Sequence, residues 1–373
     1  MALSLIFRGI YSLEATLRRV TLRSARDGSR RISRAFKMRV ALLEASHWHV
    51  PLYLAALERP GVEVVAVSDR EAVKGPGIAE RFSCAQYQSY QDLLKRTKID
   101  FAFVFGRHVE MPTIGGALID RKIPFAIEKP CGTTASSVAT LRARAESAGV
   151  YVAVPFIFRV SELINAIRKA EGTLPTRLHH ASFRFIVGPP SRYIASGSAW
   201  MLDPSQAGGG CTINVGTHFI DMFRMLTGND VTTVAAVMNS RGHGGEVEDY
   251  SMLVMTASDG TVGTVETGYT FPSGKIEQRE FSFALSSDAN YYRSAPAGML
   301  VSRRRDPDES RTTTVSVGLD TDPYYGVFVD RVLADVRAGV APVAGLSEAE
   351  AVIRVLDAAY ASARLGGRPQ NVS

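Results

Sequence analysis

The stretch Phe125-Ala126-Ile127-Glu128-Lys129-Pro130 decides the fold of this chain of 373 residues. Three apolar residues form the end of an expected buried strand, and a carboxylate, an ammonium group and a ring that fixes φ follow directly. In open α/β sheets, the residues that carry chemistry lie just beyond the carboxyl ends of the strands. We therefore expect Glu128, Lys129 and Pro130 to lie at the edge of a parallel sheet and to belong to a functional site.

The pattern around this stretch is typical of repeated βαβ units. From Met38 onward, short apolar runs alternate with helical stretches, which predicts a parallel sheet flanked by helices. The expected strands cover residues 40–43, 62–67, 101–105, 123–127 and 151–154, and the expected helices cover residues 49–58, 78–82, 112–121 and 134–148. Beyond residue 154 the pattern becomes rich in strands, with residues 179–185, 231–238, 251–257, 261–270 and 281–286 as candidates. Ser347 and Glu350 predict a capping box for a final helix over residues 348–365.

A second motif follows in the later half of the chain. It consists of Trp200-Met201-Leu202-Asp203-Pro204, the triplet Gly208-Gly209-Gly210, and then Asn214, Gly216, His218 and Asp221. Together with Glu128-Lys129-Pro130, this motif resembles the Gfo/Idh/MocA family of NAD(P)-dependent oxidoreductases, which includes glucose-fructose oxidoreductase and inositol dehydrogenase. The resemblance runs from about Met38 to Gly367. It implies an α/β plus α+β chain, with a Rossmann dinucleotide-binding domain followed by a domain built on a large open, mostly antiparallel sheet.

The expected organisation has four parts, and the charge is distributed unevenly among them. We expect a basic extension at residues 1–37, the Rossmann domain at 38–155, a substrate and oligomerisation domain at 156–345, and a C-terminal helix at 346–373 that packs back on the domains. The formal net charge of the chain is +6, but the extension alone carries nine basic and two acidic residues. The remainder is close to neutral, so the charge does not support a nucleic-acid-binding surface.

Three interpretations of the extension stay open. Its apolar residues recur at helical spacing opposite an arginine-rich face, which is typical of a transit peptide or of a helix on an anionic membrane. The extension is also consistent with an over-extended reading frame that properly starts at Met38, or with a docking arm. No apolar run is long enough to span a membrane, and three cysteines without metal-like spacing favour a reducing compartment. We expect a cytoplasmic protein, or an organellar one if residues 1–37 are a transit peptide.

The loop after the first expected strand departs from the usual dinucleotide pattern. A pyrophosphate normally approaches bare glycine backbone at a helix N-terminus, but residues 44–49 contain no glycine. Ala45 and Ser46 are small, and His47 or His49 can donate a hydrogen bond to phosphate, whereas Glu44 would repel it. The residues expected to bind the cofactor are Ala45, Ser46, His47, Trp48, His49, Asp69, Arg70, Gly106, His108, Glu128, Lys129 and Pro130.

Asp69 ends the second expected strand, where an acid accepts hydrogen bonds from the adenosine ribose and repels a 2′-phosphate. NAD is therefore the expected cofactor. Arg70 leaves NADP possible, because an arginine at this position can pair with a 2′-phosphate.

The catalytic prediction rests on Lys129, Asn214 and His218. Hydride transfer from a secondary alcohol needs a group that accepts the hydroxyl proton and a fixed charge that stabilises the developing alkoxide. Lys129 is the candidate for the charge, and the resemblance implies that His218 transfers the proton. Asn214 stands where the family commonly has Asp, so we expect it to hydrogen-bond the substrate and orient His218. Arg159, Tyr193 and Trp200 are candidates for a sugar pocket, and the histidines form no metal-ligand pattern.

The resulting prediction is an NAD(P)-dependent dehydrogenase acting on a secondary alcohol of a sugar, inositol or related polyol. We expect no nucleic-acid partner, no membrane span, and a homodimer or homotetramer formed through the open sheet. Two alternatives remain. One is an NAD-dependent glycoside-cleaving enzyme of the same fold, and the other is a non-catalytic sensor or scaffold with a degenerate cofactor loop.

Overall fold

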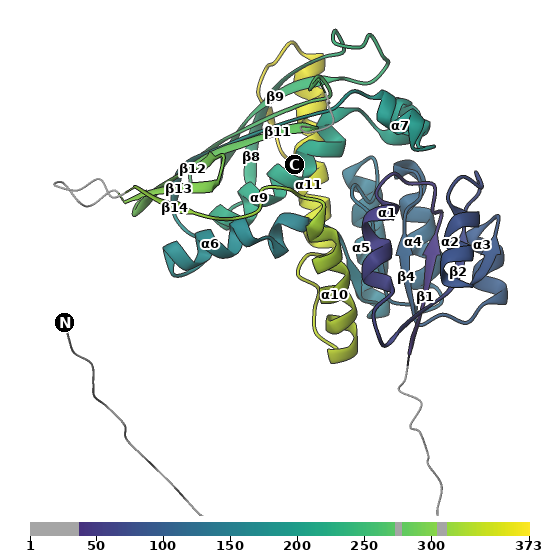
Figure 1. Cartoon of the computed structure of the whole chain (residues 1–373). Helices are drawn as coiled ribbons and strands as arrows, with labels where there is room; N and C mark the ends of the chain where they lie inside the picture. The colour runs from purple at the N-terminus through teal and green to yellow at the C-terminus, as the bar shows by residue number, and fades with distance from the viewer. Residues whose placement is uncertain (1–36, 273–277, 304–311) are drawn as a thin grey trace, which may run out of the picture. The chain divides into compact units, whose positions relative to one another are not determined.

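Two β-sheets organise the chain, one in each half (Figure 1). The computed structural model describes residues 37–272, 278–303 and 312–373. Residues Lys37–Ser373 pack as one compact unit, and the predicted ranges of the individual domains stay predictions. The interpretations of residues 1–36 fall outside the described residues.

The first sheet is a six-stranded parallel sheet in the order β3-β2-β1-β4-β5-β6, as in a Rossmann fold. Its strands are β1 (Met38–Leu43), β2 (Val62–Ser68), β3 (Ala85–Tyr87), β4 (Phe101–Val104), β5 (Phe125–Ile127) and β6 (Val152–Ala153). Its helices are α1 (Val50–Leu57), α2 (Gly75–Phe82), α3 (Tyr90–Arg96), α4 (Met111–Ile119) and α5 (Ala135–Ala148). The central strands are almost wholly buried, because helices cover both faces of the sheet.

The predicted elements of this half are confirmed, with three differences. The strand β3 and the helix α3 were not predicted, because they are short and lack a strong apolar period. The predicted start of α2 at residue 78 was wrong, because the helix begins at Gly75. Pro76 lies in its first turn, where the missing backbone N–H has no intrahelical acceptor anyway, so this proline starts the helix rather than interrupting it.

The second sheet has nine strands in the order β14-β13-β12-β11-β7-β10-β9-β8-β15. The strands are β7 (Leu178–Val187), β8 (Val231–Asn239), β9 (Tyr250–Ala257), β10 (Val262–Gly268), β11 (Arg279–Ser287), β12 (Asn290–Ala295), β13 (Gly298–Arg303), β14 (Thr312–Val315) and β15 (Gln370–Asn371). The helices of this half are α6 (Glu162–Glu171), α7 (Ser191–Ala195), α8 (Pro204–Ala207), α9 (Thr217–Thr227), α10 (Pro323–Ala338) and α11 (Leu346–Arg364). Only β7 and β10 pair in parallel among the described strands of this sheet, so it is mostly antiparallel, as predicted.

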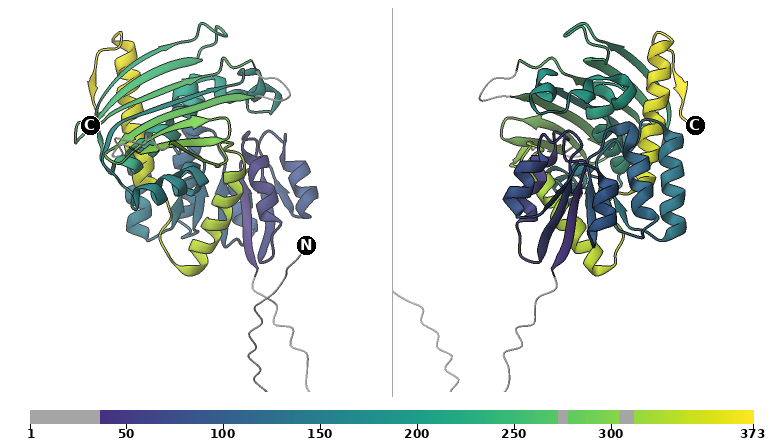
Figure 2. Two further views of the ribbon diagram at one scale, coloured as in Figure 1. Left: turned by 60° about the vertical axis from the view of Figure 1, so that its left-hand side comes forward. Right: turned by 90° about the vertical axis from the view of Figure 1, so that its right-hand side faces the viewer.

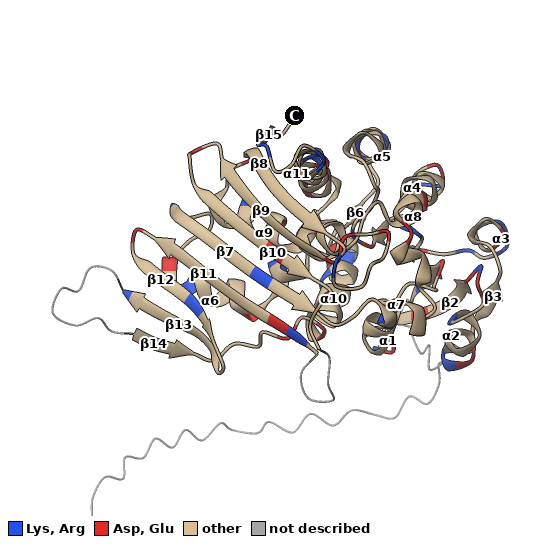
Figure 3. Cartoon of the chain, turned by 90° about the horizontal axis from the view of Figure 1, so that it is seen from above, with Lys and Arg blue, Asp and Glu red and all other residues tan. Residues whose placement is uncertain are grey.

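Helices cover one face of the nine-stranded sheet, and Figure 3 looks onto the other face. On the covered face, α9 packs under β7 and β10 while α11 packs against β8. Val237, Val254 and Val262 are exposed, at 56%, 44% and 42% of their maximum surface. The predicted oligomer through the open face stays a prediction.

The final helix joins the two halves. Its predicted capping box was placed wrongly, because α11 starts at Leu346 and Glu348 accepts a hydrogen bond from the Gly345 backbone N–H at 2.8 Å. Glu350 instead pairs with Arg142 of α5 and with Arg354. As a result, α11 lies beside α5 of the Rossmann half (Figure 2). None of the helices in the described ranges is long and apolar enough to cross a membrane.

Candidate active site

The loops that follow β1, β2, β4 and β5 meet at the carboxyl edge of the parallel sheet. In the order β3-β2-β1-β4-β5-β6 the chain direction of the connections reverses between β1 and β4, and ligands of such sheets bind in the crevice at that point. The residues predicted to bind the cofactor come together at this edge. Most of them are buried, including Ala45, Ser46, Asp69 and Pro130.

The loop after β1 has a side chain at each position where a dinucleotide loop has glycine. Glu44 is the first residue after the strand and has φ of 57°, a conformation that favours glycine. Counting the G-x-G-x-x-G spacing from it places Ser46 and His49 at the second and third glycine positions. The Glu44 carboxylate accepts a hydrogen bond from the Tyr90 backbone N–H at 3.2 Å, and burial raises its pKa.

The carboxylate of Asp69 is already saturated with hydrogen bonds from its own chain. It accepts from the backbone N–H groups of Lys74 and Gly75 at 2.8 and 2.7 Å, and from the Ser46 hydroxyl. Arg70 pairs with Glu110 at 2.8 Å. Asp69 therefore closes the turn into α2, and the cavity that it lines together with Glu44 and Ser46 holds only about 20 Å³.

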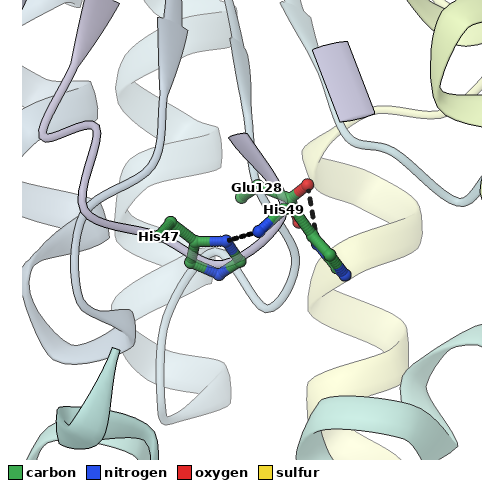
Figure 4. A group of neighbouring side chains, drawn as sticks. All are labelled: His47, His49 and Glu128. Atoms are coloured by element: carbon green, nitrogen blue, oxygen red, sulfur yellow. Dashed lines mark hydrogen bonds and ion pairs between the residues drawn. The ribbon is translucent and has the colours of Figure 1, made fainter. Parts of the chain in front are cut away.

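His47, His49 and Glu128 form a buried cluster next to this loop (Figure 4). The His49 ring lies 3.1 Å from a Glu128 oxygen, and the His49 backbone N–H donates to Nδ1 of His47 at 3.1 Å. Tyr53 donates to the same Glu128 oxygen at 2.6 Å. Burial lowers the pKa of both histidines well below the usual value, so both imidazoles are neutral.

These three side chains have the geometry to hold a metal ion, which the sequence pattern did not predict. Glu128 is 79 residues from His49, so no local spacing could reveal the cluster. Glu128 is satisfied by hydrogen bonds from Tyr53 and His49.

The second half of the chain closes over the same loop. Ser198 of the second half donates a hydrogen bond to the Ser46 carbonyl at 2.7 Å. Lys74 of the first half donates to the same carbonyl at 3.2 Å and also to the Ser196 carbonyl, which links the two halves. The Trp200 ring packs against His47 and His108, and His108 hydrogen-bonds the Ala207 carbonyl at 2.8 Å. The backbone of Gly106 lies against Ile114, where a Cβ atom would come within 2.4 Å.

The two ends of the crevice therefore differ in how they fit a nicotinamide dinucleotide. At the end predicted to hold the pyrophosphate, the side chains of Ser46, His47 and Trp200 line a cavity of only about 20 Å³, so a pyrophosphate would require these side chains to move. The end predicted to hold the nicotinamide opens into a cavity of about 240 Å³ between the two halves, lined by Lys129, Asn214 and His218. This volume is slightly below the range of about 300–1,000 Å³ that is common for ligand pockets, and it is about twelve times that of the cavity at the other end.

Lys129 is held by Asn214 at the wall of this cavity. Its ammonium group donates to the backbone carbonyl of Asn214 at 2.7 Å and to the side-chain oxygen at 3.0 Å. Asn214 lies in a π-helical turn, Thr212–Gly216, and its amide nitrogen donates to the hydroxyls of Tyr193 and Tyr269 at 2.7 and 2.9 Å. Burial lowers the pKa of Lys129 to about 8.

His218 lies in the first turn of α9 and faces the same cavity. Burial, and then the positive charge of Lys129, hold its pKa well below the usual value, so the imidazole is neutral. Its Nδ1 atom has no hydrogen-bond partner among the described residues. We expected Asn214 to orient His218, but no hydrogen bond joins the two side chains among the described residues. The Asn214 amide instead bonds to Lys129, Tyr193 and Tyr269.

The predicted substrate residues divide between three places. Tyr193 supports Asn214, to which it is hydrogen-bonded. Trp200 lines the small cavity of the pyrophosphate end. The Arg159 guanidinium forms a buried two-point ion pair with Asp221, at 2.8 and 2.7 Å, and does not line the larger cavity.

Several residues of the larger cavity were not predicted. Trp48, expected at the cofactor, lies in its wall, and so do Tyr325, Arg279 and Asp322, which no sequence pattern singled out. Tyr325 is 276 residues from His49, whose ring it contacts at 3.1 Å. No local motif marks these residues, because α10 brings Asp322 and Tyr325 to the site while β11 brings Arg279.

Comparison with known proteins fits this geometry. The model of an oxidoreductase family with an NAD-binding Rossmann fold matches residues 47–156, and the model of the GFO/IDH/MocA C-terminal domain matches residues 176–286. The chain belongs to the Gfo/Idh/MocA oxidoreductase family. It therefore carries the NAD-binding Rossmann fold of this family of enzymes, as the resemblance implied.

Individual relatives are distant. The rhizopine catabolism protein MocA of Rhizobium meliloti is 26% identical over 64% of this chain and 73% of its own length. The D-xylose 1-dehydrogenase (NADP(+)) 2 of Haloferax volcanii is 23% identical over 84% of this chain and 93% of its own length. Among solved structures, an oxidoreductase from Agrobacterium radiobacter in complex with NAD+, L-tartaric acid and magnesium superposes with a TM-score of 0.77, at 16% identity, over 90% of this chain and 98% of that one. At this identity the likeness shows the fold.

Proposed function

We propose that this Gfo/Idh/MocA protein transfers a hydride between NAD(P) and a secondary alcohol of a sugar or polyol in the cavity of about 240 Å³. The observation that carries the proposal is the convergence of a cationic Lys129 and a neutral His218 on one cavity at the nicotinamide end of the crevice. These are the two groups that alcohol oxidation requires. The D-xylose dehydrogenase among the relatives supports a sugar as the substrate class.

The residues divide the work on the substrate hydroxyl. His218 is neutral, so its imidazole can take the hydroxyl proton, and Lys129 stabilises the negative charge that develops on the oxygen. Asn214 fixes the ammonium through two acceptors and is itself fixed by two tyrosines, which keeps Lys129 in place before the reaction. A bound NAD(P) would supply the hydride acceptor for this reaction.

The closed pyrophosphate end predicts that wild-type protein binds NADH weakly and that Ser46→Gly binds it more tightly. Glycine removes the hydroxyl that occupies Asp69 and lets the pyrophosphate approach the backbone. We expect the NADH dissociation constant to fall by about tenfold or more. Removing a side chain that blocks the pyrophosphate and competes for its hydrogen bonds should make the binding free energy more favourable by about 1–3 kcal/mol. Fluorescence titration with NADH and NADPH measures the change.

Ser46→Ala is the matched control for that substitution. It frees Asp69 but keeps the Cβ atom, so it should recover only part of the gain. If neither reduced cofactor binds wild type or variant at millimolar concentration, the proposed function is wrong and the degenerate-site interpretation holds.

The pH dependence of alcohol oxidation should reflect Lys129 on its alkaline side. As the pH rises through about 8, the ammonium loses its proton and with it the charge that stabilises the alkoxide, so kcat should decline. His218 stays neutral down to well below its usual pKa, so no loss should appear near pH 6.5. The measurement is kcat at saturating substrate between pH 6 and 10.

Asn214→Asp tests whether the Lys129 ammonium causes the decline of kcat at alkaline pH. It places a carboxylate next to the Lys129 ammonium, which favours the charged form and should move the decline about one pH unit upward. A rate that instead rises above pH 8 would show that neutral Lys129 is the base and that His218 does not take the proton.

A further inference from the structure

The larger cavity contains a cationic side chain that the proposed reaction does not use. Arg192 lies in α7 and lines the cavity beside Lys129 and His49, and its positive charge contributes to the lowered pKa of both. Its guanidinium lies over the rings of Trp48, Tyr193 and Tyr269, at 5.2, 4.7 and 5.7 Å from their centres. The aromatic rings fix the plane of the guanidinium.

Within the described ranges, no acidic side chain forms an ion pair with Arg192. Its guanidinium donates a hydrogen bond to the hydroxyl of Tyr193, at 2.5 Å, and its Nε atom is buried without a partner among the same residues. Arginine offers five N–H donors in a planar fork that matches a carboxylate, and a buried donor without an acceptor is unfavourable. The contrast with Arg279 is informative, because that guanidinium contacts Asp320 and Asp322.

The cavity wall carries more positive than negative charge. Among the described residues that line it, the one carboxylate is Asp322, which is hydrogen-bonded to Arg279 at 3.0 Å. Lys129 donates to the uncharged oxygens of Asn214, and the neighbouring histidines are neutral. Glu128 is turned to Tyr53 and His49. Lys129 and Arg192 line the cavity, and no carboxylate of the described residues is hydrogen-bonded to either side chain. An anionic ligand is the chemical complement of such a site.

We propose that the substrate of this cavity carries a carboxylate, as in a sugar acid, and that Arg192 binds that carboxylate while Lys129 and His218 act on a hydroxyl group. The inference rests on the proposed function, because it names the substrate class of the same site. Arg192 lines the cavity of Lys129 and His218 and not the small cavity of Asp69, which places it with the substrate rather than with the adenosine end of the cofactor.

Calorimetric titration of the full chain, with and without NADH, tests the proposal using D-glucuronate, D-glucose and D-glucose 6-phosphate. We expect wild-type protein to bind D-glucuronate about tenfold or more tightly than D-glucose. In Arg192→Gln, which keeps a polar side chain without the charge, this preference should fall below about threefold. Arg241→Gln removes an exposed arginine from the loop after β8 and is the matched control, which should retain the preference.

Each other outcome overturns the proposal. Equal binding of the acid and the neutral sugar, or a preference that survives in Arg192→Gln, would remove Arg192 from carboxylate recognition. Tightest binding of D-glucose 6-phosphate would assign the site to a phosphate. A tenfold loss of NADH affinity in Arg192→Gln, with sugar binding unchanged, would assign Arg192 to the cofactor.

The same experiment separates this inference from the proposed function. Binding of D-glucuronate that depends on Arg192, without formation of NADH from NAD and any acid or neutral polyol, would support the carboxylate site and refute the dehydrogenase. NADH formation from neutral polyols but not from acids would support the dehydrogenase and refute the carboxylate site.

Discussion

Lys129→Met should lower kcat by about 10²- to 10⁴-fold while changing the NADH dissociation constant by less than about threefold. The ammonium acts on the alkoxide, whose charge exists only in the transition state, so its removal affects kcat rather than cofactor binding. Methionine retains the length of the side chain inside a wall where Lys129 is 2% exposed. The measurement is steady-state oxidation of the substrate, paired with NADH fluorescence titration.

His218→Ala should give a loss of similar size, and the double variant should be little worse than either single one. The two side chains act on the same hydroxyl group in one transition state, so the loss of one leaves little for the second change to remove. Lys169→Ala, on the exposed side of α6, is the control and should keep full activity. Unchanged kcat in both single variants, with unchanged melting temperatures, would show that these residues are not the catalytic pair.

The free energy of unfolding should decline steeply as the pH falls below about 6.5. His47, His49, His108 and His218 are buried and neutral, with pKa values below the usual one, and burial lowers that of His108 to about 3. In the unfolded chain each takes up a proton near pH 6.5, which favours unfolding. Each net proton changes the stability by about 1.4 kcal/mol per pH unit.

Two buried carboxyl groups act in the opposite direction. Burial raises the pKa of Glu44 and Asp221, so the folded state takes up their protons first as the pH falls. These two groups reduce the slope that the four histidines would give, and each histidine that stays neutral in the folded state contributes about 1.4 kcal/mol per pH unit below about pH 6. Since whole domains are stable by only about 5–15 kcal/mol, acid unfolding should occur within a few pH units.

Urea unfolding between pH 8 and 4.5 measures this slope. His108→Gln is the discriminating variant, because its amide can still donate to the Ala207 carbonyl but takes up no proton. It should reduce the slope by about 1.4 kcal/mol per pH unit. A stability that stays constant between pH 7 and 5 would contradict the buried, neutral state of these histidines.

The fold was predictable from the sequence because apolar periodicity and strand ends are local signals. The strands β1, β2, β4 and β5 carry continuous apolar runs, and the turn residues between them fix where each run stops. In the first half, the elements that escaped prediction are short, such as β3 with its exposed residues, whereas in the second half α6 and α10 were missed although they have 10 and 16 residues. The start of α2 was misplaced because a proline in the first turn of a helix, here Pro76, resembles a break.

The chemistry of the site was predictable in part. Two motifs identify the family, namely Glu128-Lys129-Pro130 and the residues from Gly208 to His218. The family resemblance in turn predicts that a lysine and a histidine lie at one cavity. The sequence placed a binding role on Arg159, which the structure pairs with Asp221, and assigned Asn214 to His218 where the structure assigns it to Lys129. These partners come from different elements, so their choice depends on packing geometry and charge at positions that no spacing reveals.

The sequence by itself determined the family, the order of the two sheets along the chain and the absence of glycine from residues 44–49, because each is a property of consecutive residues. Only the tertiary structure decided what that absence means. In the folded chain Ser46 is hydrogen-bonded to Asp69, and His49 contacts both Glu128 and Tyr325. Arg192 lies among aromatic rings and has no acidic partner among the described residues. The pKa values of the buried groups follow from the same packing, since desolvation depends on every element that surrounds a side chain rather than on its neighbours in sequence.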